Sequence, residues 1–497
     1  MRALRLATLS VLLAAPPARP QEFECPDHGG PPWREMRTVH FSVWTDPSSG
    51  KAREMAEEVE QVLELVRHGL FKTPPHMPGV IRVFAPRSKE EFGLFASKNV
   101  AGFVALGTAW GPTIVVPGPL GDWGRIRLAH ELTHLVASRA FARQPAWFRE
   151  GLASFMESVG TSGVGATPTV GGVPRHRFAS VFPYHGGVAS VLRARYQLLG
   201  GDARDASRSY ALAWALVHFL VNRHPQEFGQ LQLRFVKGQE PATAWREVFP
   251  QWDPAVPGAT DELDGEIGKY LARGSFGYRD VHLPPAPPVT ELPLTAADAH
   301  DIRLSLPWWN RGEKLPPERL QAEVDEALRH DPGCVAALSL LAGMHPERAL
   351  ALAEEATAAH PDDVRAWLLL AQALPKEAAP RREQALRKAV EAGPASARAL
   401  NSLAWQLLGT GRSREALPLA SKAAGLAPWG AAELDTLVGV LEDLGRCQDA
   451  LAVERRAVDV LPEGLDEKSR APYLERLARL QARCGPMAGP APGAGGK

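Results

Sequence analysis

The first part of the chain carries short β-like segments with one helical segment among them. Apolar and polar residues alternate over TVHFSVWTD (38–46), as expected for a half-buried strand. GVIRVFA (79–85) and PTIVVPG (112–118) are apolar runs bounded by Gly and Pro, which is typical of strands. The stretch 50–71 places apolar residues at helical spacing. This pattern predicts a small sheet interleaved with a helix.

Helical patterns dominate after residue 121. A helix is predicted through 122–140, and a second begins at Pro145, because proline suits the first turn of a helix. The stretch 159–175 is rich in glycine and is predicted to be a loop. Helical spacing then continues to about residue 274. Strands followed by helices indicate an α+β domain over 37–275.

The C-terminal part is repetitive. Residues 276–315 are rich in proline and are interpreted as a linker. Over 316–484 the motif Ala-x4-Pro recurs, and its period matches the tetratricopeptide repeat (TPR), in which small alanines let paired helices approach. We expect three to five units; the alternative is a helical bundle without repeat function. The prolines that end the motif are Pro332, Pro361, Pro394, Pro428 and Pro462, at intervals of 29, 33, 34 and 34 residues.

Composition sets broad limits on the class of protein. A chain of 497 residues is too long for one ordinary core, and 45% hydrophobic with 23% charged residues is a globular composition. The 56 Lys and Arg balance the 56 Asp and Glu, so the formal net charge is zero. With no basic surface signal in the sequence, we expect no nucleic-acid partner.

The amino end resembles an export signal. Arg2 and Arg5 lie beside a short apolar run, and small residues follow it, which predicts a signal peptide over 1–18. Cleavage after Ala15 and cleavage after Ala18 both fit, and an uncleaved anchor is the alternative. No later segment is long and apolar enough to span a membrane. We therefore expect an exported protein, periplasmic or extracellular, with a flexible tail at 485–497.

The four cysteines are far apart in the sequence. Cys25, Cys334, Cys447 and Cys484 form no Cys-x-x-Cys pair, which argues against a zinc site made of cysteines. Export would permit a disulfide, and the nearest pair in sequence is Cys447 with Cys484. For most of them the expected role is that of a small buried hydrophobic residue.

The segment LAHELTHLV (128–136) carries the chemistry of greatest interest. His130 and His134 are four residues apart, so both project from one face of the predicted helix toward one cation. Glu131 lies about 100° around that helix and can reach a metal-bound water. A chance match remains the alternative when this motif is taken alone.

A second motif supplies a third ligand. PAWFREGLASFMES (145–158) presents Glu150 near the head of a helix, and two histidines with one glutamate form a standard catalytic zinc set. Gly151 and Ala153 are small, which would let this helix pack tightly against the helix of His130. Glu157 returns to the same face and could hydrogen-bond the outer nitrogen of a ligand histidine. The alternative for both glutamates is a solvated carboxylate.

HELTH (130–134) together with WFREGLA (147–153) resembles the gluzincin metallopeptidases, and the layout resembles the peptidase MA-like domain that precedes TPR repeats. The resemblance implies a gluzincin-type zincin domain, with a small mixed sheet, an active-site helix and a helical subdomain, followed by an all-α TPR solenoid. It also implies Zn²⁺ held by His130, His134 and Glu150. Arg149 departs from the pattern, since asparagine is usual before the ligand glutamate. The Gly-x-Met-Glu-Asn segment of aminopeptidases is missing, which argues for an endopeptidase.

The resemblance also implies a division of catalytic roles. Zinc would polarise the scissile carbonyl, and Glu131 would act as general base. Tyr210 is similar to the tyrosine that stabilises the oxyanion in related enzymes, although an aromatic anchor at a helix start is the alternative. For His218, a buried, hydrogen-bonded histidine is the favoured reading. The strand at 112–118 could pair with an extended substrate, and the loop 159–175 could cover the cleft.

The sequence therefore leads to one principal hypothesis and two others. The principal one is an exported zinc metallopeptidase that cleaves a peptide or protein and whose TPR part binds a protein partner or presents substrate. The second is a non-catalytic TPR scaffold with a degenerate peptidase domain. The third is a zinc hydrolase of non-peptide amide bonds, which would share the same metal ligands.

Overall fold

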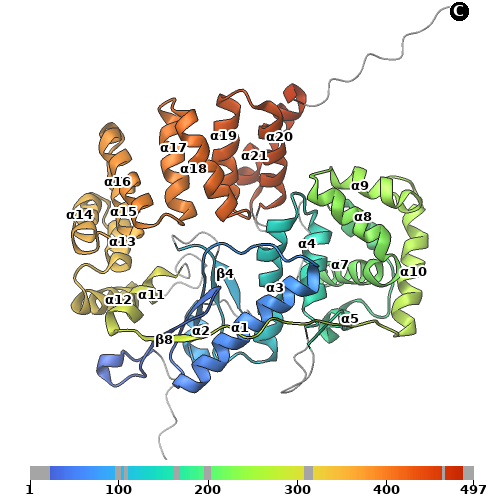
Figure 1. Ribbon diagram of the computed structural model, residues 1–497, viewed down its shortest axis with the longest axis horizontal. Coiled ribbons are helices and arrows are strands. Elements are labelled where there is room, and N and C mark those ends of the chain that lie inside the picture. Colours follow the sequence, from blue (N-terminus) through green and yellow to red (C-terminus); the bar gives the residue numbers. More distant parts are fainter. Residues whose placement is uncertain are drawn as a thin grey trace, which may run out of the picture.

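A computed structural model shows a mostly helical chain with one small mixed sheet (Figure 1). The predicted signal peptide and tail lie outside the described residues, as do residues 160–167 of the glycine-rich stretch; its described part is not all loop, because it contains a short strand at Thr169–Val170. None of the described helices is long and apolar enough to cross a membrane. The structure describes residues 23–95, 102–105, 110–159, 168–194, 203–306, 317–461 and 465–484.

The main sheet has six strands in the order β4-β5-β3-β2-β1-β8. β2, β3 and β5 are parallel to one another, and β1, β4 and β8 run antiparallel to their neighbours. β2, β3 and β5 confirm the three strands predicted from sequence. The strands are β1 (Arg34–Arg37), β2 (Phe41–Thr45), β3 (Ile81–Ala85), β4 (Phe103–Ala105), β5 (Thr113–Val115) and β8 (Thr290–Pro293); β6 (Thr169–Val170) and β7 (Arg279–Asp280) form a separate two-stranded sheet.

Side-chain alternation along the central strands builds two cores, one on each face of the sheet. Val43 and Val83 face the core shared with the long helices, whereas Trp44 and Phe84 face a smaller aromatic core on the other side. The helices before the repeats are α1 (Ser49–Leu70), α2 (Lys89–Phe95), α3 (Asp122–Ala140), α4 (Ala146–Met156), α5 (Arg175–Val181), α6 (Val188–Arg193), α7 (Ala203–Arg223), α8 (Pro225–Val236), α9 (Pro241–Val248) and α10 (Ala259–Arg273).

The stretch predicted as a linker is part of the fold, and the domain also begins before residue 37. Within 276–315, β8 pairs antiparallel with β1 and forms one edge of the sheet. α11 (Ala296–Ser305) packs on the aromatic core. Its start is a reciprocal capping box: Asp298 N–H donates to Thr295 Oγ1 (3.1 Å), and Thr295 N–H donates to Asp298 Oδ2 (2.8 Å). The many prolines obscured this start signal.

The repeat prediction is confirmed as a row of helix pairs. Four of the five predicted prolines follow the second helix of a pair, and the fifth, Pro462, lies outside the described residues. The first pair, α11 with α12, begins 20 residues before the predicted boundary. The pairs stack along one side of the molecule (Figure 1). They are α11 with α12 (Pro317–His330), α13 (Val335–Met344) with α14 (Ala349–Ala359), α15 (Val364–Ala373) with α16 (Ala379–Ala392), α17 (Ala397–Gly409) with α18 (Ser413–Leu426), and α19 (Ala431–Asp443) with α20 (Cys447–Asp459); α21 (Glu467–Cys484) ends the row.

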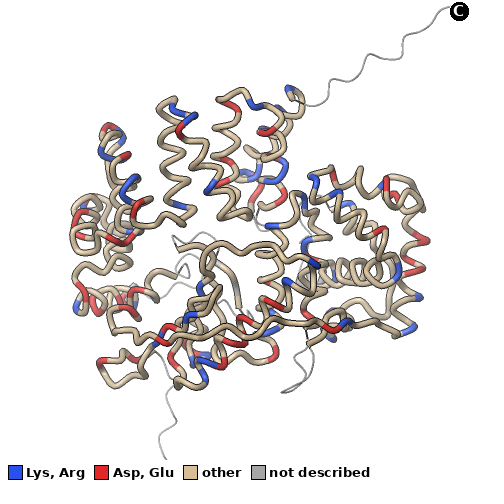
Figure 2. Tube along the Cα trace, viewed as in Figure 1, with Lys and Arg blue, Asp and Glu red and all other residues tan. Residues whose placement is uncertain are grey.

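Cysteine and charge placement also follow from this arrangement. Cys447 and Cys484 form a disulfide that ties α20 to α21, and Cys25 and Cys334 are free and buried. Basic and acidic residues are interspersed along the helices of both parts (Figure 2), in keeping with the zero net charge.

Two packing predictions need correction. β5 lies between β3 and β4, so both of its backbone edges are occupied and it is not a docking edge for an extended substrate. The short β4, which carries no clear sequence signal, takes the edge position. Gly151 faces α7 rather than α3: a Cβ added there would lie 2.7 Å from the carbonyl oxygen of Ala213 and 2.5 Å from Cγ2 of Val217.

Gly151→Ala should therefore destabilise the protein by about 1–3 kcal/mol, because the new methyl group would overlap the backbone of Ala213 and the side chain of Val217, and α4 and α7 would have to move apart. Gly229→Ala, inside α8, is the matched control. An added Cβ there meets nothing within 4 Å, so better helix propensity should stabilise by about 0.5–1 kcal/mol. Denaturant midpoints measure both changes. Similar midpoints for the two variants would contradict the tight α4–α7 contact.

Candidate metal centre

Two adjacent helices bring three candidate ligands together. α3 carries His130 and His134 one turn apart, and α4 packs across it with Glu150 in its first turns. The Nε2 atoms of His130 and His134 each lie 3.5 Å from the same oxygen of Glu150, Oε2. All three ligand atoms lie within 4.8 Å of one another. The histidine spacing and the distant glutamate thus converge as the sequence predicts.

These separations fit a tetrahedral ion. Ligand bonds of about 2.05 Å at tetrahedral angles put neighbouring donor atoms about 3.3–3.4 Å apart. The two nitrogen-to-oxygen distances of 3.5 Å are close to that value. The donor set of two imidazoles and one carboxylate suits zinc. The residues present therefore fit the metal that the sequence motifs imply.

Glu157 orients the first histidine. Nδ1 of His130 lies 2.8 Å from Oε1 of Glu157, so the ring donates outward and directs Nε2 toward Glu150. Glu157 is held in turn by Arg177 (2.6 and 2.8 Å) and by His176 Nε2 (2.8 Å), both from α5. Burial opposes the charge on Glu157, but these donors lower its pKa far below the usual range. The carboxylate is therefore ionised and fixed.

The site has a strong electrostatic bias toward a cation. Burial lowers the pKa of His130, but the hydrogen bonds to Glu150 and Glu157 outweigh it and raise that pKa to about 9. Burial likewise raises the pKa of Glu150, while the two histidines and Arg149 bring it well below its ordinary value. A buried group of carboxylates thus stabilises positive charge at this point, whether that charge is a proton or a metal ion.

Arg149, which departs from the pattern of the motif that this segment resembles, holds the second oxygen of the candidate ligand Glu150. Its Nε donates to Glu150 Oε1 at 3.0 Å, which leaves Oε2 toward the histidines. Its terminal nitrogen donates to the main-chain oxygen of Asp459, at the end of α20, at 2.8 Å. Arg149 therefore connects the candidate ligand with the repeat part of the chain.

The Asp459 side chain strengthens this connection. Arg143, just after α3, donates to both of its oxygens at 2.6 and 3.2 Å, and the N–H of Gln144 donates at 3.2 Å. Asp459 is 9% exposed, so the pair is shielded from solvent. The segment between α3 and α4 is thus fixed against the last complete helix pair.

A second contact joins the end of α3 to the repeats. Arg139 donates to the main-chain oxygens of Gly425 and Leu426 at 3.1 and 3.0 Å. Its guanidinium group also lies 5.0 Å from the ring centre of Trp429. Arg139, Arg143 and Arg149 therefore hydrogen-bond to residues at the ends of α18 and α20.

Glu131 and Tyr210 border the ligands. The Glu131 side chain is 21% exposed and lies 3.9 Å from Arg127, and the His134 side chain is 25% exposed, whereas His130 is 4% exposed; the group therefore meets solvent on the side of Glu131 and His134. The Tyr210 ring, on α7, lies 6.4 Å from the ring of His130 and beneath the guanidinium of Arg177. Both residues therefore lie beside the candidate metal position.

His218 is a buried structural histidine, as the favoured reading holds. Its Nδ1 lies 2.7 Å from the Tyr270 hydroxyl, and its Nε2 lies 2.9 Å from the carbonyl oxygen of Gly171. The carbonyl can only accept, so Nε2 carries the proton and Nδ1 accepts from the tyrosine. Burial lowers the pKa of His218 to about 4, and the ring stays neutral.

Three residues around the centre escape sequence reasoning: His176, Arg177 and Asp459. The first two follow the glycine-rich stretch, so the sequence does not show that they lie close to α4 in space. Asp459 is over 300 positions away from Arg149. A basic pair soon after a loop is a weak signal. No spacing rule in the sequence would join these residues to Glu157 or Glu150.

Comparisons with known proteins add limited information. A family model described as a protein of unknown function (DUF1570) matches residues 127–242, a segment that contains the three candidate ligands and Tyr210. No curated protein matches the chain.

Solved structures of helical-repeat proteins resemble part of the chain at low TM-score. A crystal structure of MamA is 17% identical, with 31% of this chain and 87% of that chain covered and a TM-score of 0.25. A MamA fragment from Desulfovibrio magneticus RS-1 is 16% identical, covering 33% and 84%, at 0.24. YrrB, titled a TPR protein with an unusual peptide-binding site, is 20% identical, covering 32% and 84%, at 0.26.

Zinc binding at this centre should strengthen as pH rises toward 9. With a pKa of about 9, His130 is protonated at pH 7 and must release that proton to bind a metal. Apparent affinity should therefore fall about tenfold for each pH unit below 9. Titration calorimetry measures both affinity and proton release. The difference between wild type and the Glu150→Ala variant gives the contribution of this site. Equal affinity at pH 6 and pH 8 would contradict the expectation.

Asp459→Ala should destabilise the protein by about 3 kcal/mol, because it leaves Arg143 buried without its carboxylate. The matched control on the same helix is Asp449→Ala, whose partner Arg446 is exposed, and its expected cost is below about 1 kcal/mol. Denaturant midpoints compare the two. Equal midpoints would show that the contact between α20 and the candidate metal centre is energetically unimportant.

Proposed function

We propose that the chain is a zinc-dependent metallopeptidase of the gluzincin, peptidase MA-like type, joined to a TPR array. The observation that carries the proposal is the approach of His130 and His134 to one oxygen of Glu150 at 3.5 Å each. A buried carboxylate behind His130 and an open side at Glu131 support catalysis rather than a closed structural site.

The roles of the side chains follow from their positions. Bound zinc would supply a polarised, readily deprotonated water and a Lewis acid for the carbonyl. Glu131, on the solvent side, takes the proton of the attacking water and passes it to the leaving amine. Tyr210, beside His130, donates a hydrogen bond to the developing oxyanion. Arg149 and Glu157 hold the ligands in one orientation.

The edge of the sheet supports an extended peptide as substrate. β4 is the outer strand on the side of β5, and an extended chain can add to such an edge through main-chain hydrogen bonds. Gly102, just before β4, lies against Arg127 of α3: an added Cβ would be 3.5 Å from Arg127 Cγ. Arg127 is one turn from Glu131, so this edge leads to the candidate metal centre. This favours a peptide over a non-peptide amide.

The remaining parts fit an exported protein with a binding array. A disulfide such as Cys447–Cys484 persists in oxidising compartments, which agrees with the export signal expected at the amino end. Tandem helix pairs commonly bind proteins or peptides. A non-catalytic scaffold is the second candidate, and the observation that favours it is the length of the array, from α11 to α21.

Glu131→Gln should lower hydrolysis of an unfolded protein substrate at least about 100-fold while zinc content stays unchanged, because the variant keeps all three ligands but loses the base. Glu57→Gln, an exposed change on α1, is the control and should behave as wild type. Metal analysis and a fluorescent casein assay give the two readouts.

The outcomes separate the candidate functions. A wild-type chain that takes up no zinc at this centre would refute the peptidase proposal. Zinc uptake without any hydrolysis would favour the scaffold. Undiminished hydrolysis in Glu131→Gln would refute the role of that residue as base.

A further inference from the structure

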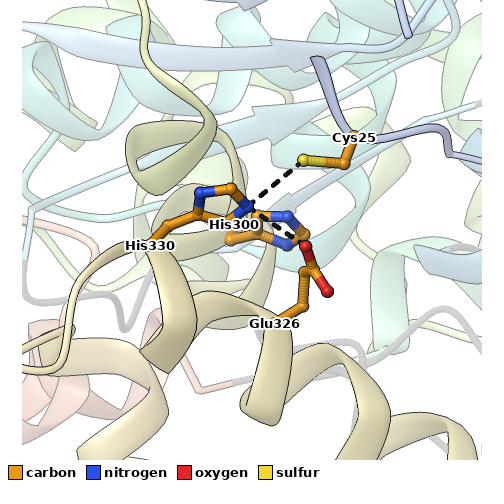
Figure 3. Close-up of side chains that lie close together, drawn as sticks. All are labelled: Cys25, His300, Glu326 and His330. Carbon is orange, nitrogen blue, oxygen red and sulfur yellow. Dashed lines mark hydrogen bonds and ion pairs between the residues drawn. The ribbon is translucent and has the colours of Figure 1, made fainter. Parts of the chain in front are cut away.

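A second group of metal-binding side chains lies at the junction between the sheet and the repeats. We call it the junction cluster, and Figure 3 shows its members converging from three segments. One comes from the chain before β1, one from α11 and two from α12. Their ligand atoms all lie within 4.8 Å of one another. The members are Cys25, His300, Glu326 and His330.

The two histidines have their outer nitrogens engaged by carboxylates. Nδ1 of His300 lies 2.9 Å from Glu323 Oε1, and Nδ1 of His330 lies 3.3 Å from Asp27 Oδ2. An ionised carboxylate only accepts, so Nδ1 of His300 donates to Glu323 and its Nε2 carries a lone pair. His330 lies between two carboxylates, and its Nε2, 3.1 Å from Oε1 of Glu326, faces the centre of the cluster. A carboxylate behind the imidazole is the usual support of a metal-binding histidine.

The clearest sign of a missing ligand is Nε2 of His300. This residue is 2% exposed, and its Nε2 is buried with no hydrogen-bond partner among the described residues. Leaving a buried polar atom unsatisfied costs about 1–3 kcal/mol. The hydrogen bond to Glu323 accounts for one ring nitrogen of His300, and no contact among the described residues accounts for the other. A metal ion would satisfy that lone pair.

The distances within the cluster agree with a metal-centred arrangement. Cys25 Sγ lies 3.5 Å from His330 Nε2, and Glu326 Oε1 lies 3.1 Å from the same nitrogen. Sulfur and nitrogen bound to one tetrahedral zinc ion are about 3.6 Å apart, and nitrogen and oxygen about 3.3–3.4 Å. Small side-chain rotations would bring the remaining pairs from within 4.8 Å to these values.

We propose that the junction cluster binds one divalent ion of the zinc class in a closed, structural site. The set of one thiolate, two imidazoles and one carboxylate offers four protein ligands, which leaves no open position for substrate. The ion joins Cys25 to α12, although Cys25 and His330 are 305 positions apart in the sequence. It fastens the amino-terminal segment and the first repeat pair to one another. This site does not depend on the proposed peptidase function.

Cobalt provides a direct test, because a thiolate bound to Co²⁺ gives an intense near-ultraviolet charge-transfer band. The full chain is stripped of metal, kept under conditions that leave Cys25 reduced, and titrated with Co²⁺. The centre at His130 has no sulfur ligand and contributes no such band. We expect the band to saturate at one equivalent in Glu150→Ala, and at between one and two equivalents in wild type, where the centre at His130 can also take up Co²⁺ without adding to the band.

Two substitutions identify the ligands. Cys25→Ser should abolish the band, whereas Cys334→Ser, which changes the other free buried thiol, should keep it. His330→Gln keeps the thiolate and should weaken Co²⁺ affinity at least about tenfold. Circular dichroism checks that each variant is folded. A folded, reduced wild-type chain without the band, or a band that survives in Cys25→Ser, would overturn the proposal.

Discussion

The arrangement around the candidate metal centre depends on how the two oxygens of Glu150 are divided. Oε2 lies between two histidine nitrogens, and Oε1 accepts from Arg149. Without the arginine, a buried carboxylate would have two oxygens and only the histidines to balance its charge. Arg149 fixes its rotation, and the backbone of Asp459 fixes Arg149. The ligand geometry in the first part of the chain is therefore set partly by a helix in the second.

The predictable parts of this structure are those that local rules govern. Period-two alternation locates β2, and apolar runs bounded by Gly and Pro locate β3 and β5. The i, i+4 rule places His130 and His134 on one face of α3. The proline period locates the helix pairs because the motif prolines lie just after the second helix of a pair, where proline is common since it cannot continue the helix. Such signals depend on residues that are close in sequence, so they can be recognised without knowledge of tertiary contacts.

The missed parts depend on long-range contacts. β8 is too polar to be recognised as a strand and exists because β1 offers an unpaired edge. Arg149 looked like an anomaly because its partner, Asp459, is far away in sequence. Cys25 and His300 gave no pattern at all, since a ligand group assembled from three segments has no characteristic spacing. Only the three-dimensional arrangement relates these residues.

The repeat row is anchored at both ends. α11 packs on the aromatic face of the sheet, and α20 meets the segment between α3 and α4 through Asp459. A free solenoid can gain or lose a unit of about 34 residues and still bind at its surface. Here one added or deleted pair would shift Asp459 by a whole repeat and release Arg149. The array therefore spans a fixed distance between its two contacts with the first part of the chain. The geometry of the candidate metal centre constrains the number of its units.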